Sequence, residues 1–285
     1  MTKDEFRCTL RLRVRWAEVD AQKIVFNGHY ALYFDTGIGE YWRSMAMPYE
    51  QTMHYLGGDM VVRKSTFEFE DSARYDDMLD IGVRCSRIGK SSMVFTCGVF
   101  RGPDLLVKGE LVYVYIDPVT SKSQPVPQQL RDALEAFEAG KPMIDVRVGG
   151  WAELGTDAGH IRTTVFVQEQ NIPEDMEWDE ADQSCTHAVA YNRFGLALAT
   201  GRMLEHVPGV AKIGRMAVMK NMRGSGVGRA VLDALTKSGR EQGYRDALLH
   251  AQASATPFYA HAGFAPRGAI FEEAGIPHVE MVKAI

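Results

Sequence analysis

Three closely spaced glycines, Gly224, Gly226 and Gly228, are the residues of this 285-residue chain with the clearest potential for chemistry. The residues that follow recur at the spacing of one helical face: Val227, Ala230, Val231, Ala234 and Leu235. The glycines therefore mark a helix start, where free backbone N–H groups and the positive end of the helix dipole favour an anion. Glycine also permits positive φ and leaves no Cβ between the backbone and a phosphate. With Arg223 and Arg229 on either side, the segment predicts a pyrophosphate site.

Two other phosphate-binding loops fit this segment less well. A Walker loop needs a lysine and then Ser or Thr after its last glycine, but Gly228 is followed by Arg229. A dinucleotide loop needs Gly-x-Gly-x-x-Gly, whereas the spacing here is Gly-x-Gly-x-Gly. A glycine-rich helix entry without a ligand stays open as an alternative.

The pattern Arg223-x-x-Gly226-x-Gly228 resembles the Arg/Gln-x-x-Gly-x-Gly/Ala signature of the GNAT acetyltransferases. Further segments resemble the same family, and its ElaA-type branch closely, in the same order along the chain: Phe166-Val167-x-Glu169-Gln170-x-x-Pro173, Ala251-Gln252-Ala253, Phe258-Tyr259-x-x-x-Gly263-Phe264 and Gly275-Ile276-Pro277-His278. The resemblance covers residues 143–285 and implies a GNAT fold, a mixed sheet with flanking helices.

The same resemblance implies acetyl transfer from acetyl-CoA to an amine. It places the pantetheine along Ala217, Val218 and Met219, and the pyrophosphate on Arg223, Gly224, Ser225, Gly226, Val227, Gly228 and Arg229. It also implies that Tyr259 donates a proton to the departing CoA thiolate, a role for which a phenol that stays protonated at neutral pH is suited. Glu169 and His278 are both candidates for the general base, and neither is preferred.

The N-terminal half has a different pattern. A strand is expected at Cys8–Trp16, followed by a helix from Tyr30 whose apolar residues recur over about four turns. Two glycines inside that helix, Gly37 and Gly39, are expected to allow close packing against a sheet. Strand-type runs then follow at 61–69, 78–87, 92–100 and 105–116, which predicts an antiparallel sheet around one helix, the hotdog arrangement.

Two segments of this half resemble hotdog thioesterases of the hydroxybenzoyl-CoA type: Trp16-x-x-x-Asp20-x-x-x-Ile24-Val25-Phe26-Asn27-x-x-Tyr30 and Ser72-Ala73-Arg74-Tyr75-Asp76-Asp77. The resemblance implies that Asp20 is the catalytic carboxylate, acting as nucleophile or general base. It also implies that the helix start, with Ile24 and Asn27, offers backbone N–H groups to the thioester oxygen. The alternative is that Asp20 only caps a turn. In this family the sites form between subunits, which implies a homodimer or homotetramer.

Bulk composition restricts the partners and the compartment. The net charge of −5 argues against nucleic acid, and no apolar run is long enough to predict a membrane span. The four cysteines form no Cys-x-x-Cys pair, which favours reduced thiols in the cytoplasm, and the scattered histidines indicate no metal site.

The sequence therefore predicts an α+β protein of two domains, a hotdog domain over residues 1–140 and a GNAT domain over 143–285. The expected function is bifunctional, with acyl-CoA hydrolysis in the first domain and acetyl transfer to an amine in the second. CoA thioesters are the expected substrates, and no metal is expected. As alternatives, the hotdog half is a non-catalytic acyl-CoA-binding or oligomerisation module, or the GNAT half is a CoA sensor.

Overall fold

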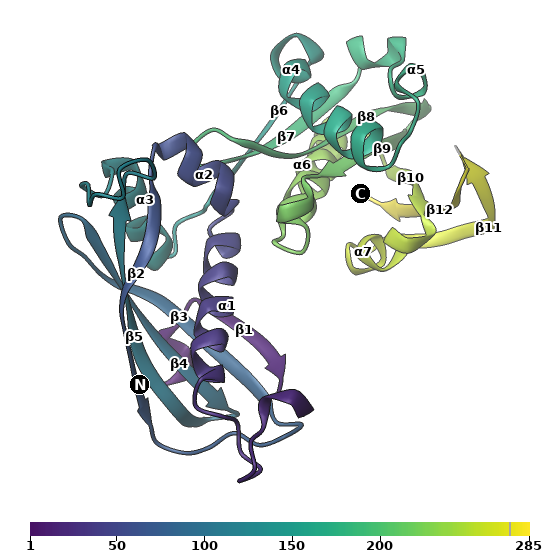
Figure 1. The fold of residues 1–285 in the computed structure, drawn as a ribbon. Helices are drawn as coiled ribbons and strands as arrows, with labels where there is room; N and C mark the ends of the chain where they lie inside the picture. The colour runs from purple at the N-terminus through teal and green to yellow at the C-terminus, as the bar shows by residue number, and fades with distance from the viewer. Residues whose placement is uncertain (274) are drawn as a thin grey trace. The chain divides into compact units, whose positions relative to one another are not determined.

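The computed structural model describes residues 1–273 and 275–285, and the chain divides into two compact units, Met1–Met143 and Ile144–Ile285. The N-terminal unit is a five-stranded antiparallel sheet with one long helix against it (Figure 1). Its strands, in spatial order, are β1 (Cys8–Arg13), β3 (Met78–Ile88), β4 (Ser92–Arg101), β5 (Asp104–Ile116) and β2 (Asp59–Phe69). Its helices are α1 (His29–Ser44), α2 (Tyr49–Leu56) and α3 (Gln128–Glu138). The predicted antiparallel sheet around a single helix is confirmed.

Helix α1 forms because large apolar side chains recur at helical spacing, and it buries that face against the sheet. Its buried residues are Tyr30, Tyr33, Phe34, Gly37, Ile38, Tyr41 and Trp42. A Cβ at Gly37 would lie 2.9 Å from Val83 Cγ2, so the close packing expected there is confirmed. The same expectation for Gly39 is wrong, because a Cβ at that position meets nothing within 4 Å.

The first strand is shorter than expected. β1 ends at Arg13, and the chain enters a short 3-10 turn over Trp16–Glu18 instead of continuing as a strand to Trp16. The turn is stabilised by the Glu18 carboxylate, which accepts hydrogen bonds from the backbone N–H and the Nε of Arg15 at 2.7 and 2.8 Å. A pattern of alternating strand-forming residues does not indicate that a nearby side chain will hold the backbone in a turn through hydrogen bonds.

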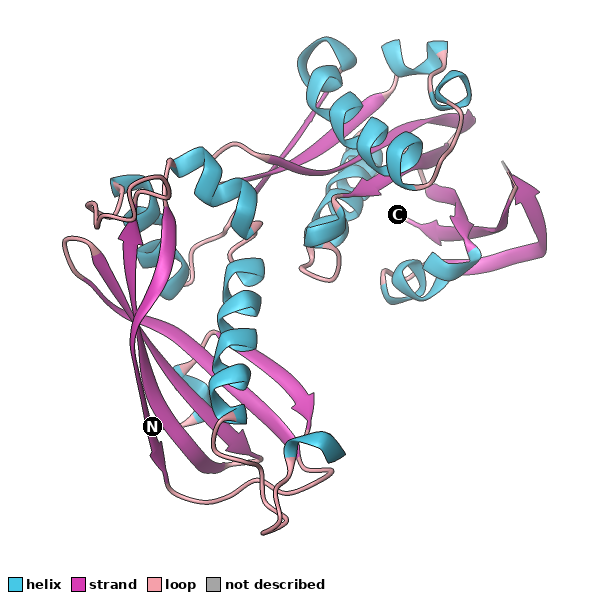
Figure 2. Ribbon diagram, viewed as in Figure 1, coloured by secondary structure: helices cyan, strands magenta, loops and turns pink. Residues whose placement is uncertain are grey.

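The C-terminal unit is a mixed seven-stranded sheet with helices packed against it (Figure 2). In spatial order its strands are β11 (Ala265–Glu273), β12 (Ile276–Ala284), β10 (Asp246–Gln252), β9 (Val210–Val218), β8 (Ala197–Val207), β7 (Thr186–Asn192) and β6 (Ile144–Gly149). Its helices are α4 (Trp151–Arg162), which continues as a π-helical turn (Thr163–Glu169), α5 (Glu174–Glu177), α6 (Val227–Glu241) and α7 (Thr256–His261). The predicted mixed sheet with flanking helices is confirmed.

The one parallel pair of this sheet, β9 with β10, is paired only over a short stretch. The register runs from Val210 opposite Asp246 to Lys212 opposite Leu248. Beyond Lys212, β9 is paired only with β8, and Arg215 there has a positive φ of 51° beside a break in the β8–β9 register. Because β9 and β10 are no longer paired beyond Lys212, one edge of β9 is left open in the middle of the sheet.

Helix α7 begins one residue earlier than its sequence suggests, since Thr256 followed by Pro257 is the usual pattern of an N-cap and a first helical residue. Thr256, expected as the cap, is the first helical residue, and Ala255 precedes it as the N-cap without a side-chain hydrogen bond. Pro257 lies in the first turn and Gly263, with φ of 88°, follows the helix, as expected from their types.

Candidate functional site

The glycine loop of the C-terminal unit leads into α6 as predicted. Gly224 and Gly226 have φ values of 82° and 90°, which a residue with a side chain adopts only at a cost, and Gly226 is the N-cap of α6. In the described chain, the backbone N–H groups of Gly224, Gly226, Val227 and Gly228 have no hydrogen-bond partner. These groups form an electropositive helix entrance suited to an anion such as a diphosphate.

The third glycine has a packing role. A Cβ at Gly228 would lie 2.9 Å from Val218 Cγ2, so the missing side chain lets the start of α6 approach the end of β9. Ala217, also predicted to contact a ligand, is 1% exposed in the core of the unit. Its backbone is therefore the part available to a ligand. Val218 and Met219 are partly exposed where β9 ends.

The two arginines that flank the loop are already bound by protein groups. Arg223 donates to both carboxylate oxygens of Glu169 at 2.6 Å each, a bidentate pair. Arg229 donates from Nε to Asp233 at 2.8 and 2.9 Å and from NH1 to the His261 carbonyl at 2.9 Å. The charge that the sequence places beside the loop is therefore partly neutralised, and the unpaired amides remain the main anion-binding feature.

This pairing changes the interpretation of Glu169. Its hydrogen bonds from Arg223 lower the pKa of the Glu169 carboxyl despite the opposing effect of burial. A carboxylate with a lowered pKa and both oxygens engaged is a weak proton acceptor. Glu169 therefore positions Arg223 and is poorly suited to be the general base.

Tyr259 lies on α7 and is 8% exposed. It lines a cavity of about 520 Å³, together with Phe166, Ile172 and Met216, in the C-terminal unit. Burial raises the pKa of Tyr259 to about 12, so its hydroxyl keeps its proton at neutral pH. The Tyr259 hydroxyl has no hydrogen-bond partner among the described residues, which leaves it available to a ligand in the cavity.

A buried ion-pair network forms part of the wall of this cavity. Its members are the cations Arg162, Arg202 and Arg215 and the anions Glu177, Asp179 and Asp182. Asp182 accepts from Arg162 at 2.7 Å and from Arg202 at 2.6 Å, and Trp178 lies 4.5 Å from the Arg162 guanidinium. The charges balance, so the network stiffens the wall without a net charge. The sequence does not indicate this network, because its members share no regular spacing.

In the N-terminal unit, Asp20 closes a tight turn. One carboxylate oxygen accepts a hydrogen bond from the Gln22 backbone N–H at 2.8 Å, and the Asp20 carbonyl accepts from the Lys23 N–H at 2.9 Å. Lys23 has a φ of 62°, in the region that favours glycine. The other carboxylate oxygen of the partly exposed Asp20 has no partner among the described residues. Asp20 therefore caps the turn with one carboxylate oxygen, and its other oxygen is left available for chemistry.

The backbone after this turn carries two unpaired donors. The N–H groups of Lys23, Val25 and Phe26 are hydrogen-bonded to carbonyls within the unit. Those of Ile24 and Asn27, the two residues expected to bind the thioester oxygen, have no partner in the described part of the chain. One unengaged carboxylate oxygen and two unengaged amides therefore belong to one short segment before α1.

A buried glutamate that the sequence did not indicate as functional holds the segment before α1 in place. Glu18 is 3% exposed and accepts hydrogen bonds from Arg15 and, at 2.8 Å, from the Tyr33 hydroxyl. Burial raises the pKa of Glu18, but the hydrogen bonds from Arg15 and Tyr33 outweigh it, and the net shift is downward. Glu18 is therefore ionised at neutral pH and fixes the chain two residues before Asp20.

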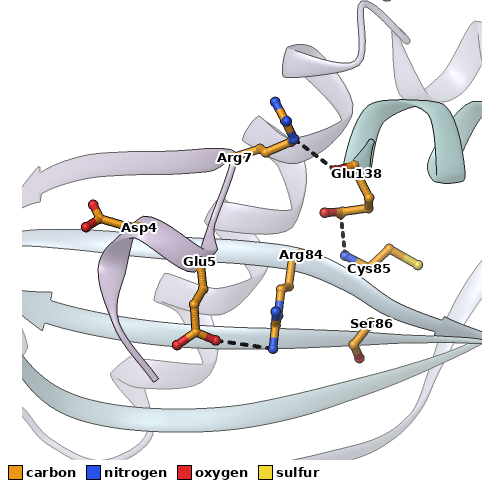
Figure 3. Close-up of a pocket in the computed structure, with 7 residues that line it drawn as sticks. All are labelled: Asp4, Glu5, Arg7, Arg84, Cys85, Ser86 and Glu138. Atoms are coloured by element: carbon orange, nitrogen blue, oxygen red, sulfur yellow. Dashed lines mark hydrogen bonds and ion pairs between the residues drawn. The ribbon is translucent and has the colours of Figure 1, made fainter. Parts of the chain in front are cut away.

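A second cavity, of about 650 Å³, lies elsewhere in the N-terminal unit (Figure 3). Its lining is Asp4, Glu5, Arg7, Arg84, Cys85, Ser86 and Glu138. Figure 3 shows Glu138 directed at the backbone N–H of Cys85. The Glu138 carboxylate accepts a hydrogen bond from this N–H at 2.7 Å and another from the Tyr41 hydroxyl at 2.6 Å. Because Glu5 and Glu138 are engaged with groups of the same unit, this cavity fits a structural role that ties α3 to the sheet.

Comparison with known proteins assigns the two halves. The acetyltransferase (GNAT) domain family matches residues 155–285, and the thioesterase superfamily matches residues 22–108. An uncharacterized N-acetyltransferase, YjcF of Bacillus subtilis, is 36% identical over 129 residues, which cover 45% of this chain and 90% of the relative. The C-terminal half belongs to the GNAT acetyltransferase family. In the N-terminal half, the match to the thioesterase superfamily covers residues 22–108.

Two further relatives resemble one half each. The thioesterase half is similar to the acyl-CoA thioester hydrolase YbgC of Escherichia coli O6:H1, 28% identical over 120 residues, which cover 42% of this chain and 89% of that protein. The solved structure of a putative N-acetyltransferase from Lactobacillus plantarum covers 50% of this chain and 99% of its own, with 29% identity and a TM-score of 0.47.

The GNAT and thioesterase families both use CoA-linked substrates, so the fusion joins two domains of related substrate chemistry. Residues 1–273 and 275–285 contain no group of His, Cys, Asp and Glu side chains arranged to hold a metal ion. Within the same described residues, every helix is too short or too polar to cross a membrane.

Proposed function

We propose that the protein is a bifunctional acyl-CoA enzyme whose thioesterase half hydrolyses an acyl-CoA and whose GNAT half transfers acetyl from acetyl-CoA to an amine. One observation carries the proposal. Each half has unpaired backbone N–H groups and a side chain suited to its proposed reaction. That side chain is Asp20 for hydrolysis in one half and Tyr259 for proton donation to the thiolate in the other.

In the GNAT half, the unpaired amides of loop 223–229 bind the CoA diphosphate at the entrance of α6. The open edge of β9, with Ala217, Val218 and Met219 at its end, accepts the amide-containing pantetheine arm by strand-like hydrogen bonds. The acceptor nitrogen attacks the acetyl carbonyl carbon, a C–N bond forms and the C–S bond breaks. The departing thiolate takes the proton of the Tyr259 hydroxyl.

In the thioesterase half, the unengaged oxygen of Asp20 takes a proton from a water that attacks the thioester carbonyl, or it attacks the carbonyl itself to form an anhydride that water then hydrolyses. In both routes the C–S bond breaks and CoA leaves as the thiolate. During the attack, negative charge develops on the carbonyl oxygen. The N–H groups of Ile24 and Asn27 are unpaired and stabilise this oxygen in the transition state. The Gln22 N–H holds the other Asp20 oxygen and so fixes the carboxylate during attack.

A homodimer or homotetramer through the thioesterase half is part of the proposal. Strand β2 lies at the sheet edge and is paired only with β5. Val61, Val62 and Phe69 on it are 43%, 50% and 53% exposed. A long edge strand with exposed apolar side chains is suited to pairing with a second copy. Sedimentation velocity tests this, and a monomer at working concentration would contradict it.

The cysteines support the proposed cytoplasmic location. Cys8, Cys85, Cys97 and Cys185 are all free thiols in the structure. Proteins of oxidising compartments usually pair their cysteines, whereas cytoplasmic proteins keep them reduced.

The deciding experiment measures thiol release from acyl-CoAs of increasing chain length, and from aromatic acyl-CoAs, by the intact protein and by Asp20→Asn. Hydrolysis by the wild type and its loss in Asp20→Asn, with acetyl transfer unchanged, is the expected result. Asp76→Asn, which alters an exposed carboxylate of the same half, is the matched control.

Two results favour the alternative functions. No thiol release above background for any acyl-CoA would indicate that the thioesterase half is a binding or assembly module. CoA binding without acetyl transfer to any amine would indicate that the GNAT half is a CoA sensor.

A further inference from the structure

The GNAT cavity contains a histidine paired with a carboxylate. His250 on β10 and Glu273 at the end of β11 both line the cavity that contains Tyr259. His250 Nδ1 lies 3.0 Å from Glu273 Oε2. The Phe271 ring meets the His250 ring edge-on at a centroid distance of 4.9 Å, so both a charge and a ring fix the orientation of the imidazole.

The pairing determines which nitrogen of His250 is available. A carboxylate only accepts hydrogen bonds, so Nδ1 carries the proton and donates it to Glu273, and Nε2 keeps its lone pair. Nε2 has no partner among the described residues. Burial raises the pKa of Glu273, but the hydrogen bond and charge of His250, with the charges of His278 and Lys212, give a net lowering. Glu273 is therefore an anion when His250 takes up a proton.

Other charged groups near the His250–Glu273 pair do not compete with its hydrogen bond. Glu280, opposite His250 on β12, is bound by Arg267 Nε at 2.5 Å. His278, His206 and Lys212 are the remaining nearby titratable groups that line the cavity.

The remaining candidate bases of the cavity region are less suitable. Glu169 is bound at both oxygens by Arg223, and Glu177 is held by Arg162 and Arg215. His278 Nδ1 contacts only the neutral carbonyl of Ile276, at 2.8 Å. A neutral partner stabilises an imidazolium less than a carboxylate does. His250 is thus the imidazole of this cavity with an ionised partner.

We infer that His250 is the general base of acetyl transfer and that Glu273 is its positioning residue. The inference rests on the acetyltransferase function proposed above. As the acceptor nitrogen bonds to the acetyl carbon and the C–S bond breaks, Nε2 of His250 takes one proton from that nitrogen. Tyr259 gives one proton to the thiolate. The imidazolium and the phenolate then exchange a proton through solvent, so the enzyme returns to its starting state.

The test compares kcat and KM for acetyl transfer over a pH range of about 5 to 10 in the wild type, His250→Gln, Glu273→Gln and His278→Gln. The probes are acetyl-CoA with 2-phenylethylamine, 1,4-diaminobutane and glucosamine. His278→Gln is the matched control, because it removes another imidazole from the same cavity.

The expected result is specific to a base. His250→Gln lowers kcat by about 10²–10⁴-fold at neutral pH and leaves the KM for acetyl-CoA nearly unchanged. His250→Gln also removes the fall in kcat toward low pH (the acidic limb of the rate profile). Its loss of kcat relative to the wild type becomes smaller toward high pH, where the amine loses its proton to water without a base from the protein. Glu273→Gln keeps the limb but moves it to lower pH, because the anion that favours the imidazolium is gone. His278→Gln keeps an acidic limb.

A rescue control and two contradicting results distinguish a wrong role for His250 from a wrong transferase function. His250→Ala is expected to regain rate with added imidazole, which a purely structural defect would not show. A wild-type rate and limb in His250→Gln, or loss of the limb in His278→Gln alone, would overturn the role of His250 and leave the transferase function standing. A wild type that transfers acetyl to no probe and does not bind CoA would overturn the proposed function itself, and the base with it.

Discussion

Burial determines what the Tyr259 side chain is able to do. A phenol removed from water holds its proton more strongly, and the pKa of Tyr259 is raised to about 12. The same burial places it in a cavity where its hydroxyl has no protein partner among the described residues. A residue type that is often only a packing group therefore has a protonated hydroxyl available in a cavity.

The prediction for Tyr259→Phe is a fall in kcat for acetyl transfer of about 10²-fold or more, because the thiolate loses its proton donor. Because the pKa is raised, the phenol stays protonated up to about pH 11, so the wild type should show no loss of rate from its ionisation below that pH. Steady-state rates across pH measure both effects. Tyr244→Phe, outside the cavity, is the control, and an unchanged rate in Tyr259→Phe would refute the role.

Neighbouring charges revise the role of Glu169 in the same way. By type and position it is a candidate base, but the bidentate contact with Arg223 makes it an anchor for the loop that precedes α6. A residue's chemistry thus depends on which partner the fold brings to it.

At the scale of elements, two glycines of α1 have opposite environments. A Cβ at Gly37 meets Val83 and Ile81 at 2.9 and 3.1 Å, whereas one at Gly39 meets nothing within 4 Å. Gly37→Ala is expected to destabilise the N-terminal unit by about 1–3 kcal/mol through overpacking. Gly39→Ala is expected to stabilise it by up to about 1 kcal/mol, because alanine favours the helix.

Urea unfolding of the two variants beside the wild type measures the difference. Each variant serves as the control for the other, since both add one methyl group to the same helix. Equal effects of the two substitutions would contradict the close approach of α1 to β3.

The ion-pair network that holds α5 beside the sheet predicts a second stability effect. Asp182→Asn leaves the network with one uncompensated positive charge, although Arg162 keeps Glu177 and Arg202 keeps Asp179, and should cost about 3 kcal/mol of unfolding free energy. Burial raises the pKa of Asp182, but its bonds from the two arginines outweigh this and lower it overall. Its stabilisation is therefore present above the ordinary Asp pKa of about 3.9 and is lost as the pH falls below it.

Calorimetry of Asp182→Asn from neutral pH down to about pH 3 tests this prediction. The deficit relative to the wild type should shrink as the solution is acidified. Asp175→Asn, which alters an exposed carboxylate on α5 outside the network, should stay within about 0.5 kcal/mol of the wild type. A deficit that does not depend on pH would show that the loss comes from packing alone.

At the scale of the whole molecule, the chain consists of two units that each have a sheet and a buried core of their own. Residues 1–143 and 144–285, produced separately, are therefore expected to fold and to keep their respective activities. Circular dichroism, thermal unfolding and the two assays measure this. A half that is unfolded alone, or one that folds but is inactive, would show that the units depend on each other.

Local spacing in the sequence was sufficient for much of the fold. Helix α1, strands β2 to β5 and the glycine-started helix α6 follow from periodic apolar residues and from glycine. β11 contains Pro266 and Gly268, both poor strand formers, so its place at the sheet edge depends on pairing with β12. Its sequence alone gives little indication of a strand.

The sequence by itself indicated the two families, the glycine-marked start of α6 and the candidate side chains Asp20 and Tyr259, because these depend on residues close together in the chain. Only the tertiary structure decided which of those groups are engaged. Arg223 meets Glu169 across 54 positions and His250 meets Glu273 across 23, and no local pattern records either contact. Charge pairing and burial act through space, so the availability of each group for chemistry is a property of the folded chain.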